Sequence, residues 1–417
     1  MWLANGWATA SDHYYYTKNI GVGIGGRGDG DLSYQAGNFT ITGVLTVGNN
    51  AEELKQETAN LLSLKATVSG GQLNGVTITG IQVKSLGSAT HRWVTTWGTA
   101  EEKCDLLDKD GNKPAMPKLS LADTTVRQII RVTTGGEKFR LRLSNQYGES
   151  DVTVKSLHLA KQVKADESTI DTATDKEVTV DGKTEFVIPT GKVIITDPVD
   201  FPVNALDNVA VTFYFGTAPT ENITGHRGAR ATTYQVSGNH VSDATFTGAQ
   251  TTTSWFFLAD ASIWSTKESK AVVCFGDSIT DGYGTDADYL GKKPDSYTRW
   301  VDYFAKRLQA NDKTKYISVI NEGIGTNSIL DAYPTDAGKD RFARDLLKHD
   351  GVGYCIILFG VNDITKLKDT DKYDQLLPEY QKMVKLCHDN GIKVYGAPIL
   401  PFGTSDSYTE ASEQVRT

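Results

Sequence analysis

The chain has 417 residues, of which 39% are hydrophobic, enough for two or three domains with substantial cores. Its formal net charge of −8 argues against nucleic acid or an anionic membrane surface as a partner. No apolar run is long enough to cross a bilayer, so no transmembrane helix is expected. The start, Met1–Gly6, lacks the basic and apolar regions of a signal peptide, so none is expected there.

Residues 1–88 show the weakest pattern of apolar and polar residues, so their secondary structure is the hardest to predict. Phe39–Thr42 and Val76–Thr79 are predicted strands, the second after an Asn74-Gly75 turn signal. Leu54–Leu64 is a predicted short helix. We expect a β-containing N-terminal region without a defined role.

Residues 89–265 are predicted to be all-β. Apolar and other residues alternate in Phe139–Leu143 and in Val209–Phe215, and turn signals such as Gly135-Gly136 separate the runs. This pattern favours an antiparallel sandwich or jelly roll. Trp93 and Trp97 could stack on sugar rings, but packing in the core is the favoured interpretation.

Residues 270–417 follow a polar stretch, Ser265–Lys270, that is predicted to be a linker. Beyond it, strand-like runs alternate with helical patterns, which indicates βαβ units and a parallel sheet. Cys274 and Cys355 fall in the strand runs and are interpreted as small buried apolar residues. The four cysteines of the chain show neither metal-ligand spacing nor a dense disulfide framework.

Three polar turns follow three predicted strands of this sheet. The run Ala271–Phe275 leads into Gly276-Asp277-Ser278, and Tyr316–Ile320 leads into Asn321–Asn327. Tyr354–Phe359 leads into Gly360-Val361-Asn362-Asp363. Because the carboxyl ends of parallel strands meet at one edge, the three turns should converge there.

A hydroxyl, an amide and free backbone N–H groups at one place are what acyl transfer requires. Ser278 is therefore a candidate nucleophile. The alternative for Ser278 is that it only caps the following helix.

Gly276-Asp277-Ser278-Ile279 and Gly360-Val361-Asn362-Asp363 resemble the first and third signature blocks of the SGNH (GDSL-type) hydrolases, and Asn321–Asn327 resembles the second. The resemblance covers residues 270–405 and implies a flavodoxin-like, three-layer α/β hydrolase domain that is incomplete at its C-terminus. The stretch Arg92–Trp264 more weakly resembles the β-rich N-terminal module of some secreted bacterial members, which are similar to acetyl esterases acting on plant polysaccharides.

The resemblance assigns roles to particular residues. Ser278 matches the nucleophile and also an oxyanion N–H donor, and Asn362 matches the side-chain oxyanion donor. The second block normally supplies a glycine N–H; here the position is Thr326, with Gly325 as the alternative. The Thr326 N–H is expected to serve only if the turn does not demand a positive φ. No metal or cofactor is needed.

The fourth block of the family, Asp-x-x-His, is not found. No histidine of the chain has an aspartate three residues before it. The resemblance therefore implies a chain truncated before its catalytic histidine, which is expected beyond residue 417, and little activity for the chain as it stands. His349 and His388 are the alternative bases, and both are interpreted as ordinary surface histidines.

The predicted function is that of a serine esterase which hydrolyses short acyl esters, acetyl above all, on a carbohydrate. The partner would be an acylated small molecule or a polysaccharide, and the location extracellular or at a bacterial cell surface, both by analogy with the family. One alternative is a lipid or thioester acyl hydrolase. The other is a carbohydrate-binding or interaction protein with an inactive hydrolase segment.

Overall fold

The computed structural model describes residues 91–107, 111–287 and 290–417, together with four short strands nearer the N-terminus. Contacts divide the chain into two compact units, Met1–Ala89 and Thr90–Thr417. In the first unit, β1 (Tyr14–Tyr16) pairs with β2 (Gly21–Gly23), and β3 (Leu32–Gln35) pairs with β4 (Asn38–Ile41). β4 confirms the strand predicted at Phe39. The strand predicted at Val76–Thr79 and the helix predicted at Leu54–Leu64 lie outside the described residues.

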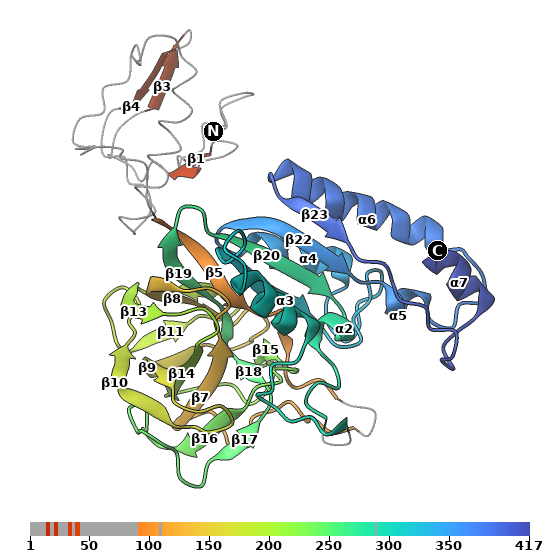
Figure 1. Cartoon of the computed structure of the whole chain (residues 1–417). Helices are drawn as coiled ribbons and strands as arrows, with labels where there is room; N and C mark the ends of the chain where they lie inside the picture. The colour runs from red at the N-terminus through yellow and green to blue at the C-terminus, as the bar shows by residue number, and fades with distance from the viewer. Residues whose placement is uncertain are drawn as a thin grey trace. The chain divides into compact units, whose positions relative to one another are not determined.

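Residues 91–266, called the antiparallel module below, form antiparallel sheets only (Figure 1). The largest has the order β10-β9-β14-β7-β16-β17, with β11 also pairing with β9. Its strands are β7 (Thr124–Arg131), β9 (Val152–Gln162), β10 (Ile170–Glu177), β11 (Phe186–Ile188), β14 (Asn208–Phe215), β16 (Thr233–Ser237) and β17 (Gln250–Thr252).

The second sheet of the module has the order β12-β8-β19-β5, with β13 also pairing with β8. Its strands are β5 (His91–Gly98), β8 (Gly136–Ser144), β12 (Val193–Ile195), β13 (Val199–Val203) and β19 (Leu258–Thr266). A small third sheet contains β6 (Glu102–Lys103), β15 (Thr224–His226) and β18 (Trp255–Phe256).

One hydrophobic core is shared by the two large sheets. Phe213 and Phe215 of β14 and Phe139 and Leu141 of β8 belong to it and are fully buried, as alternation of the side chains along each strand requires. Trp97 packs edge-on against Trp255 at 4.8 Å in the same core. The prediction that Trp93 and Trp97 pack inside the protein is confirmed, because both are buried. The jelly-roll topology stays a prediction.

Residues 270–417, called the parallel segment below, contain a four-stranded parallel sheet. Its order is β21-β20-β22-β23. The strands are β20 (Lys270–Gly276), β21 (Ile317–Gly323), β22 (Val352–Leu358) and β23 (Lys393–Gly396). Numbered within the segment this is the order 2-1-3-4, which is the arrangement of flavodoxin-like, doubly wound sheets. Cys274 and Cys355 are fully buried in it, as predicted.

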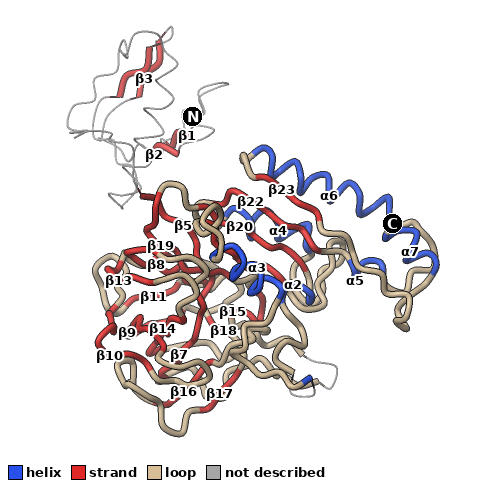
Figure 2. Tube along the Cα trace, in the orientation of Figure 1, coloured by secondary structure: helices blue, strands red, loops and turns tan. Residues whose placement is uncertain are grey.

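Helices cover both faces of the parallel sheet, as in a three-layer fold (Figure 2). The long helices are α3 (Trp300–Gln309), α4 (Gly338–Leu347) and α6 (Lys372–Asp389), and the short ones α2 (Ser278–Asp281), α5 (Val361–Ile364) and α7 (Glu410–Arg416). Val301 and Ala305 of α3 pack with Val272 and Cys274 on one face. Side chains of α4 and α6, such as Phe342 and Met383, pack with Val273 and Phe275 on the other. Among the described residues, no helix is long and apolar enough to span a membrane.

The connection predicted at Ser265–Lys270 is present but is shorter than predicted. β19 runs to Thr266 and β20 begins at Lys270. Ser269, between them, is fully buried and bonds to the Ser265 hydroxyl at 3.0 Å. The hydroxyls of Ser265 and Thr266 bond to Ser269 in a tight turn, and Lys267 and Glu268 are exposed at its tip.

The antiparallel module also covers the edge of the parallel sheet. The hydroxyl of Ser318 in β21 donates to the Thr95 carbonyl of β5 at 2.6 Å. The Val319 N–H donates to the Thr133 hydroxyl at 2.9 Å, and Thr99 forms a parallel bridge with Asn321. The two regions therefore share a hydrogen-bonded boundary along β21.

Candidate active site

The three predicted turns follow neighbouring strands. Gly276 of β20 is in register with Gly323 of β21 and with Leu358 of β22. Neighbouring strands lie about 4.8 Å apart, so the turns begin side by side at the carboxyl edge of the sheet. β20 is the strand from which the chain order runs both ways, and open α/β sheets bind ligands at such a switch point.

Ser278 begins α2, directly after β20. Asp277 is the N-cap of this helix, and its carboxylate accepts a hydrogen bond from the Ile279 N–H at 2.9 Å. The alternative that Ser278 serves as the cap is therefore wrong. Ser278 is partly exposed, and within the described part of the chain neither its hydroxyl nor its N–H has a hydrogen-bond partner. Both remain available to a ligand.

Thr326 follows β21 and adopts φ of 63°. The turn thus demands the left-handed conformation that is unfavourable for a β-branched residue. This is the conformation in which the Thr326 N–H is not expected to serve as an oxyanion donor, and its role stays a prediction. The chain accommodates the threonine, whose N–H has no partner among the described residues, while its hydroxyl donates to the Gly325 carbonyl at 2.6 Å.

Asn362 lies in α5, after β22, where Gly360 adopts φ of 107°. A side chain at Gly360 would meet the Tyr380 hydroxyl at 2.4 Å, so only glycine fits. The Asn362 amide donates to the Asn327 carbonyl at 2.9 Å, which joins the third turn to the second. The neighbouring Asp363 strengthens this connection by accepting from the Ile329 and Leu330 N–H groups, both at 2.9 Å.

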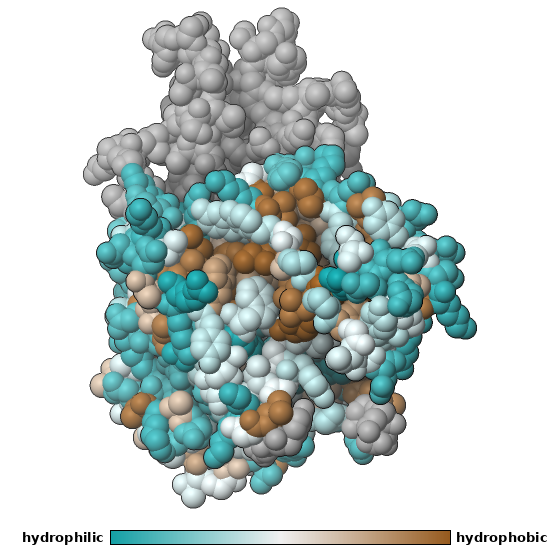
Figure 3. Space-filling model, turned by 45° about the vertical axis from the view of Figure 1, so that its right-hand side comes forward, coloured by the Kyte–Doolittle hydropathy of each residue, from teal (hydrophilic) through white to brown (hydrophobic). Residues whose placement is uncertain are grey.

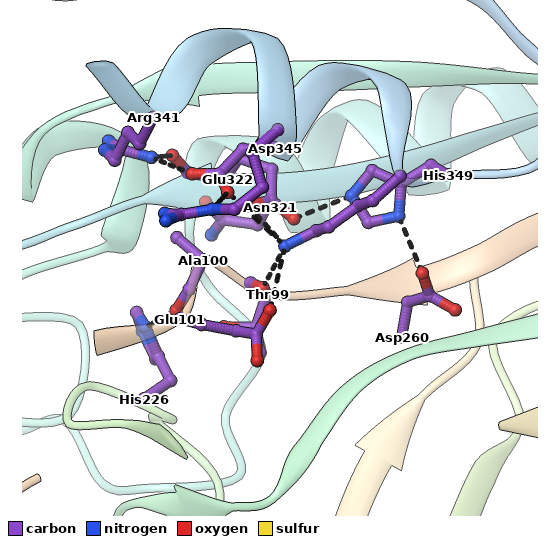
Figure 4. Close-up of polar contacts among 12 residues, drawn as sticks. Thr99, Ala100, Glu101, His226, Asp260, Asn321, Glu322, Arg341, Asp345 and His349 are labelled. Carbon is purple, nitrogen blue, oxygen red and sulfur yellow. Dashed lines mark hydrogen bonds and ion pairs between the residues drawn. The ribbon is translucent and has the colours of Figure 1, made fainter. Parts of the chain in front are cut away.

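Arg341 of α4 joins the first and second turns from inside the protein. Figure 4 shows its side chain near Asp345 and Glu322. It is fully buried, and its guanidinium donates to the carbonyls of Gly276 at 2.9 Å and Glu322 at 3.0 Å. It also donates to the Asn327 side chain at 2.9 Å and to Asp345 at 2.8 Å. One side chain therefore fixes the carboxyl ends of β20 and β21 and also Asn327, the residue to which Asn362 bonds.

Two carboxyl groups beside Ser278 hold their protons more tightly than usual. Burial raises the pKa of Asp277 to about 6, and the nearby Asp363 adds to the effect. Burial also raises the pKa of Asp363. The surroundings of the turn therefore disfavour additional negative charge.

The interpretation of His349 as a surface residue is wrong. Its side chain is fully buried between Asp260 of the antiparallel module (Nδ1, 3.1 Å) and Glu322 of β21 (Nε2, 2.7 Å) (Figure 4). Burial opposes protonation, but the hydrogen bonds to Asp260 and Glu322 outweigh it and raise the pKa of His349. His388 is exposed at the end of α6, in agreement with its interpretation.

Sequence reasoning missed His226 of β15. It is buried, and its Nδ1 lies 2.9 Å from the Ala100 carbonyl and its Nε2 3.0 Å from Asp281, the last residue of α2. Arg230 contacts the other Asp281 oxygen at 2.6 Å. No local signal marks these residues, because they lie more than fifty positions before Asp281 in a β-rich stretch. In the parts of the chain that the structure describes, no group of three or more candidate metal ligands occurs.

Residues 274–417 match the model of the GDSL-like lipase/acylhydrolase family, so this part of the chain is a domain of that family. The resemblance seen in the Gly276–Ile279 and Gly360–Asp363 blocks is thereby confirmed. A search of curated proteins finds no match.

Solved structures of esterases are also similar to this chain. One is Est24, a carbohydrate acetylesterase from Sinorhizobium meliloti, with 23% identity and a TM-score of 0.28, over 35% of this chain and 75% of that one. Another is the aryl esterase of M. smegmatis, with 22% identity and a TM-score of 0.27, over 36% of this chain and 74% of that one.

Proposed function

We propose that the chain is a serine ester hydrolase whose nucleophile is Ser278. The observation that carries the proposal is the group of partnerless polar atoms at the switch point of the sheet. The Ser278 hydroxyl, the Ser278 N–H and the Thr326 N–H have no partner within the described residues. Ser278 is partly exposed and Thr326 is exposed, so these groups are accessible at the edge where open α/β sheets bind their ligands.

In the proposed reaction the Ser278 oxygen attacks the ester carbonyl and forms an acyl–serine bond. The oxyanion accepts hydrogen bonds from the Ser278 N–H, from the Thr326 N–H (with Gly325 as the alternative) and from the Asn362 amide, which has a second N–H besides the one bonded to Asn327. A histidine takes the serine proton and returns it to the leaving alcohol. Water, activated by the same base, then releases the acid and restores Ser278.

The base in this proposal is none of the six described histidines. Both ring nitrogens of His226 contact the Ala100 carbonyl and Asp281, and both ring nitrogens of His349 contact Asp260 and Glu322. Neither side chain therefore has a ring nitrogen free to bond to the Ser278 hydroxyl. His388 ends α6 just before β23 begins, at the opposite edge of the sheet from Ser278. The remaining three, His91, His158 and His240, belong to the antiparallel module and not to the parallel segment that carries Ser278. The proposal therefore assigns the base to a histidine outside these six, as the family resemblance implies.

The proposed substrate is a short acyl ester, acetyl above all, on a carbohydrate, and the proposed location is outside the cell, where such polymers occur. The family resemblance supports both. A specific observation keeps the lipid or thioester alternative open, because Ile279 and Tyr283, next to Ser278, are 45% and 74% exposed. Apolar side chains also gather among hydrophilic ones on the face shown in Figure 3. The carbohydrate-binding alternative loses its candidate platforms, since Trp93 and Trp97 are buried.

The test is hydrolysis of an aryl acetate by the full-length gene product and by its Ser278→Ala variant, with Ser296→Ala as a matched control on an exposed serine of the same segment. Loss of the nucleophile should remove Ser278-dependent hydrolysis almost completely, by about 10³-fold or more. Equal rates for wild type and Ser278→Ala would reject the proposal. A series of acetyl, butyryl and octanoyl esters, with an acetylated oligosaccharide beside them, separates the carbohydrate and lipid alternatives.

A further inference from the structure

The nucleophile helix α2 is held from outside the parallel segment. Asp281, its last residue, lies three positions after Ser278, and its side chain is only 3% exposed. Both carboxylate oxygens are taken by the antiparallel module: Oδ1 by His226 at 3.0 Å and Oδ2 by Arg230 at 2.6 Å. Burial alone would raise the pKa of Asp281, but Arg230 and His226 hold it below its usual range, so the carboxylate is charged.

We propose that His226 and Arg230 are positioning residues for the nucleophile, and that they act through Asp281 to hold the turn that carries Ser278. The proposal deepens the proposed function and, for its catalytic consequence, rests on it. The three residues are called the Asp281 clamp below.

The clamp is rigid on the side of the module. The Nδ1 of His226 donates to the Ala100 carbonyl at 2.9 Å, and its ring stacks on Trp255 of the core at 5.9 Å. Arg230 is anchored a second time by Asp286 at 3.1 Å. Because His226 and Arg230 are each fixed by a second contact, their bonds to Asp281 set the position of α2 relative to the module.

Close packing on the side of the parallel segment leaves α2 little freedom. A side chain at Gly323 would lie 2.2 Å from the Asp281 backbone nitrogen, so the end of β21 touches α2 directly. The Asn321 amide donates to the Thr280 carbonyl at 2.9 Å. A side chain at Gly228 would come within 2.8 Å of both Asp281 oxygens, so a glycine there leaves room for the clamp. A Cβ on Gly325, beside Thr326, would be 3.7 Å from the same carboxylate.

An ion pair at the other edge of the sheet offers a matched control. Asp350 precedes β22 and accepts from Arg140 at 2.9 Å and from the Ser262 hydroxyl at 2.7 Å, both of the antiparallel module. Like Asp281, Asp350 connects the parallel segment to an arginine and to one further side chain of the antiparallel module. Asp350 lies at the amino edge, remote from Ser278. Its substitution therefore measures how much an ion pair between the two regions contributes to stability, without an effect on the Ser278 turn.

The experiment compares Asp281→Asn with Asp350→Asn in the full chain. Two experiments are made below the melting temperature. Steady-state kinetics gives kcat and KM for an aryl acetate. Amide hydrogen exchange compares the peptide 276–284 with the strand peptide 352–358. Because a displacement of the nucleophile by about 1 Å can reduce the rate about 10²-fold, we expect Asp281→Asn to lower kcat at least about tenfold with little change in KM. Exchange in 276–284 should rise at least about tenfold while 352–358 stays protected. Asp350→Asn should show neither effect.

Arg230→Met provides a second variant should Asp281→Asn fail to fold, because it keeps the His226 contact and Arg230 is 17% exposed. It should show the same two effects, smaller in size. Unchanged exchange in 276–284, or equal losses in the Asp281 and Asp350 variants, would overturn the proposal. Should wild type and Ser278→Ala hydrolyse the ester equally, the proposed function fails, and hydrogen exchange still decides whether the clamp positions the turn.

Discussion

The two edges of the parallel sheet differ in how completely their polar groups are satisfied. At the amino edge, Asp350 bonds to Arg140 and Ser262, and its N–H bonds to the Thr95 hydroxyl. At the carboxyl edge, Ser278 and Thr326 keep N–H groups without partners in the described part of the chain, and Thr326 adopts a left-handed conformation. Backbone strain of this kind persists only where the surroundings impose it, and it concentrates at functional sites. The comparison separates polar groups that join the two regions from polar groups that, among the described residues, bond to no protein atom.

The largest expected effect comes from Arg341→Met, which removes the side chain that joins both turns at the carboxyl edge. It leaves the carbonyls of Gly276 and Glu322 without their donor, and we expect the free energy of unfolding to fall by about 3–5 kcal/mol. Ester hydrolysis should fall with it. Arg140→Met at the amino edge should destabilise the protein less and leave kcat unchanged. Denaturant unfolding and kinetics measure both, and a similar kcat loss in the two variants would contradict the comparison.

Asp277→Asn should stabilise the protein at neutral pH. The pKa of Asp277 is raised from 3.8 to about 6, so its contribution to stability is complete below pH 3.8 and is lost as the pH rises through 6. Asparagine cannot ionise, yet its oxygen can still accept from the Ile279 N–H. The variant should therefore gain up to about 3 kcal/mol over wild type between pH 4 and pH 7. Unfolding curves at the two pH values test this, and a difference independent of pH would show that Asp277 does not titrate in this range.

His349→Gln should destabilise the protein in a pH-dependent way. The pKa of His349 is raised above 6.5, so its contribution is complete below that pH and is lost as the pH rises through the folded-state value. We expect a loss of about 1.5–3 kcal/mol at pH 6 and a smaller loss above pH 8. Thermal unfolding across this range measures the loss, with the exposed His388→Gln as a control expected to change nothing. A constant difference across the range would mean that His349 is not charged in the folded protein.

Thr326→Gly should have the smallest effect, and it is favourable. Glycine adopts φ of 63° without strain and keeps the N–H, so we expect a gain of about 1 kcal/mol in stability with unchanged kcat. Thr326→Ala should gain less, since alanine keeps a Cβ. Chemical denaturation of the three proteins gives the order. A loss of stability in the glycine variant would mean that the turn does not hold the threonine under strain.

The sequence predicted the parallel sheet and its three turns because those signals are local. The run Ala271–Phe275 is apolar and rich in β-branched residues, and it differs from β20 (Lys270–Gly276) by one residue at each end. The roles of Ser278, Thr326 and Asn362 stay predictions, although their turns do meet at one edge.

The sequence could not predict the contacts between the two regions. His226 reaches Asp281 across 55 positions, and His349 reaches Asp260 across 89, so no pattern within either stretch reveals the partner. His349 follows a helix with polar neighbours, which is typical of a solvated face. It is buried because a second sheet covers that face, and only the tertiary structure shows this.

The coverage of β21 by the antiparallel module bears on what the parallel segment would do alone. Without β5 and Thr133, the Ser318 hydroxyl and the Val319 N–H would lose the groups they bond to, and β21 would become an open outer strand. Open strands of this kind recruit strands from other molecules and lead to aggregation. The two regions therefore cannot be exchanged independently between proteins, and a shortened form starting at Lys270 should precipitate before its chemistry could be assayed.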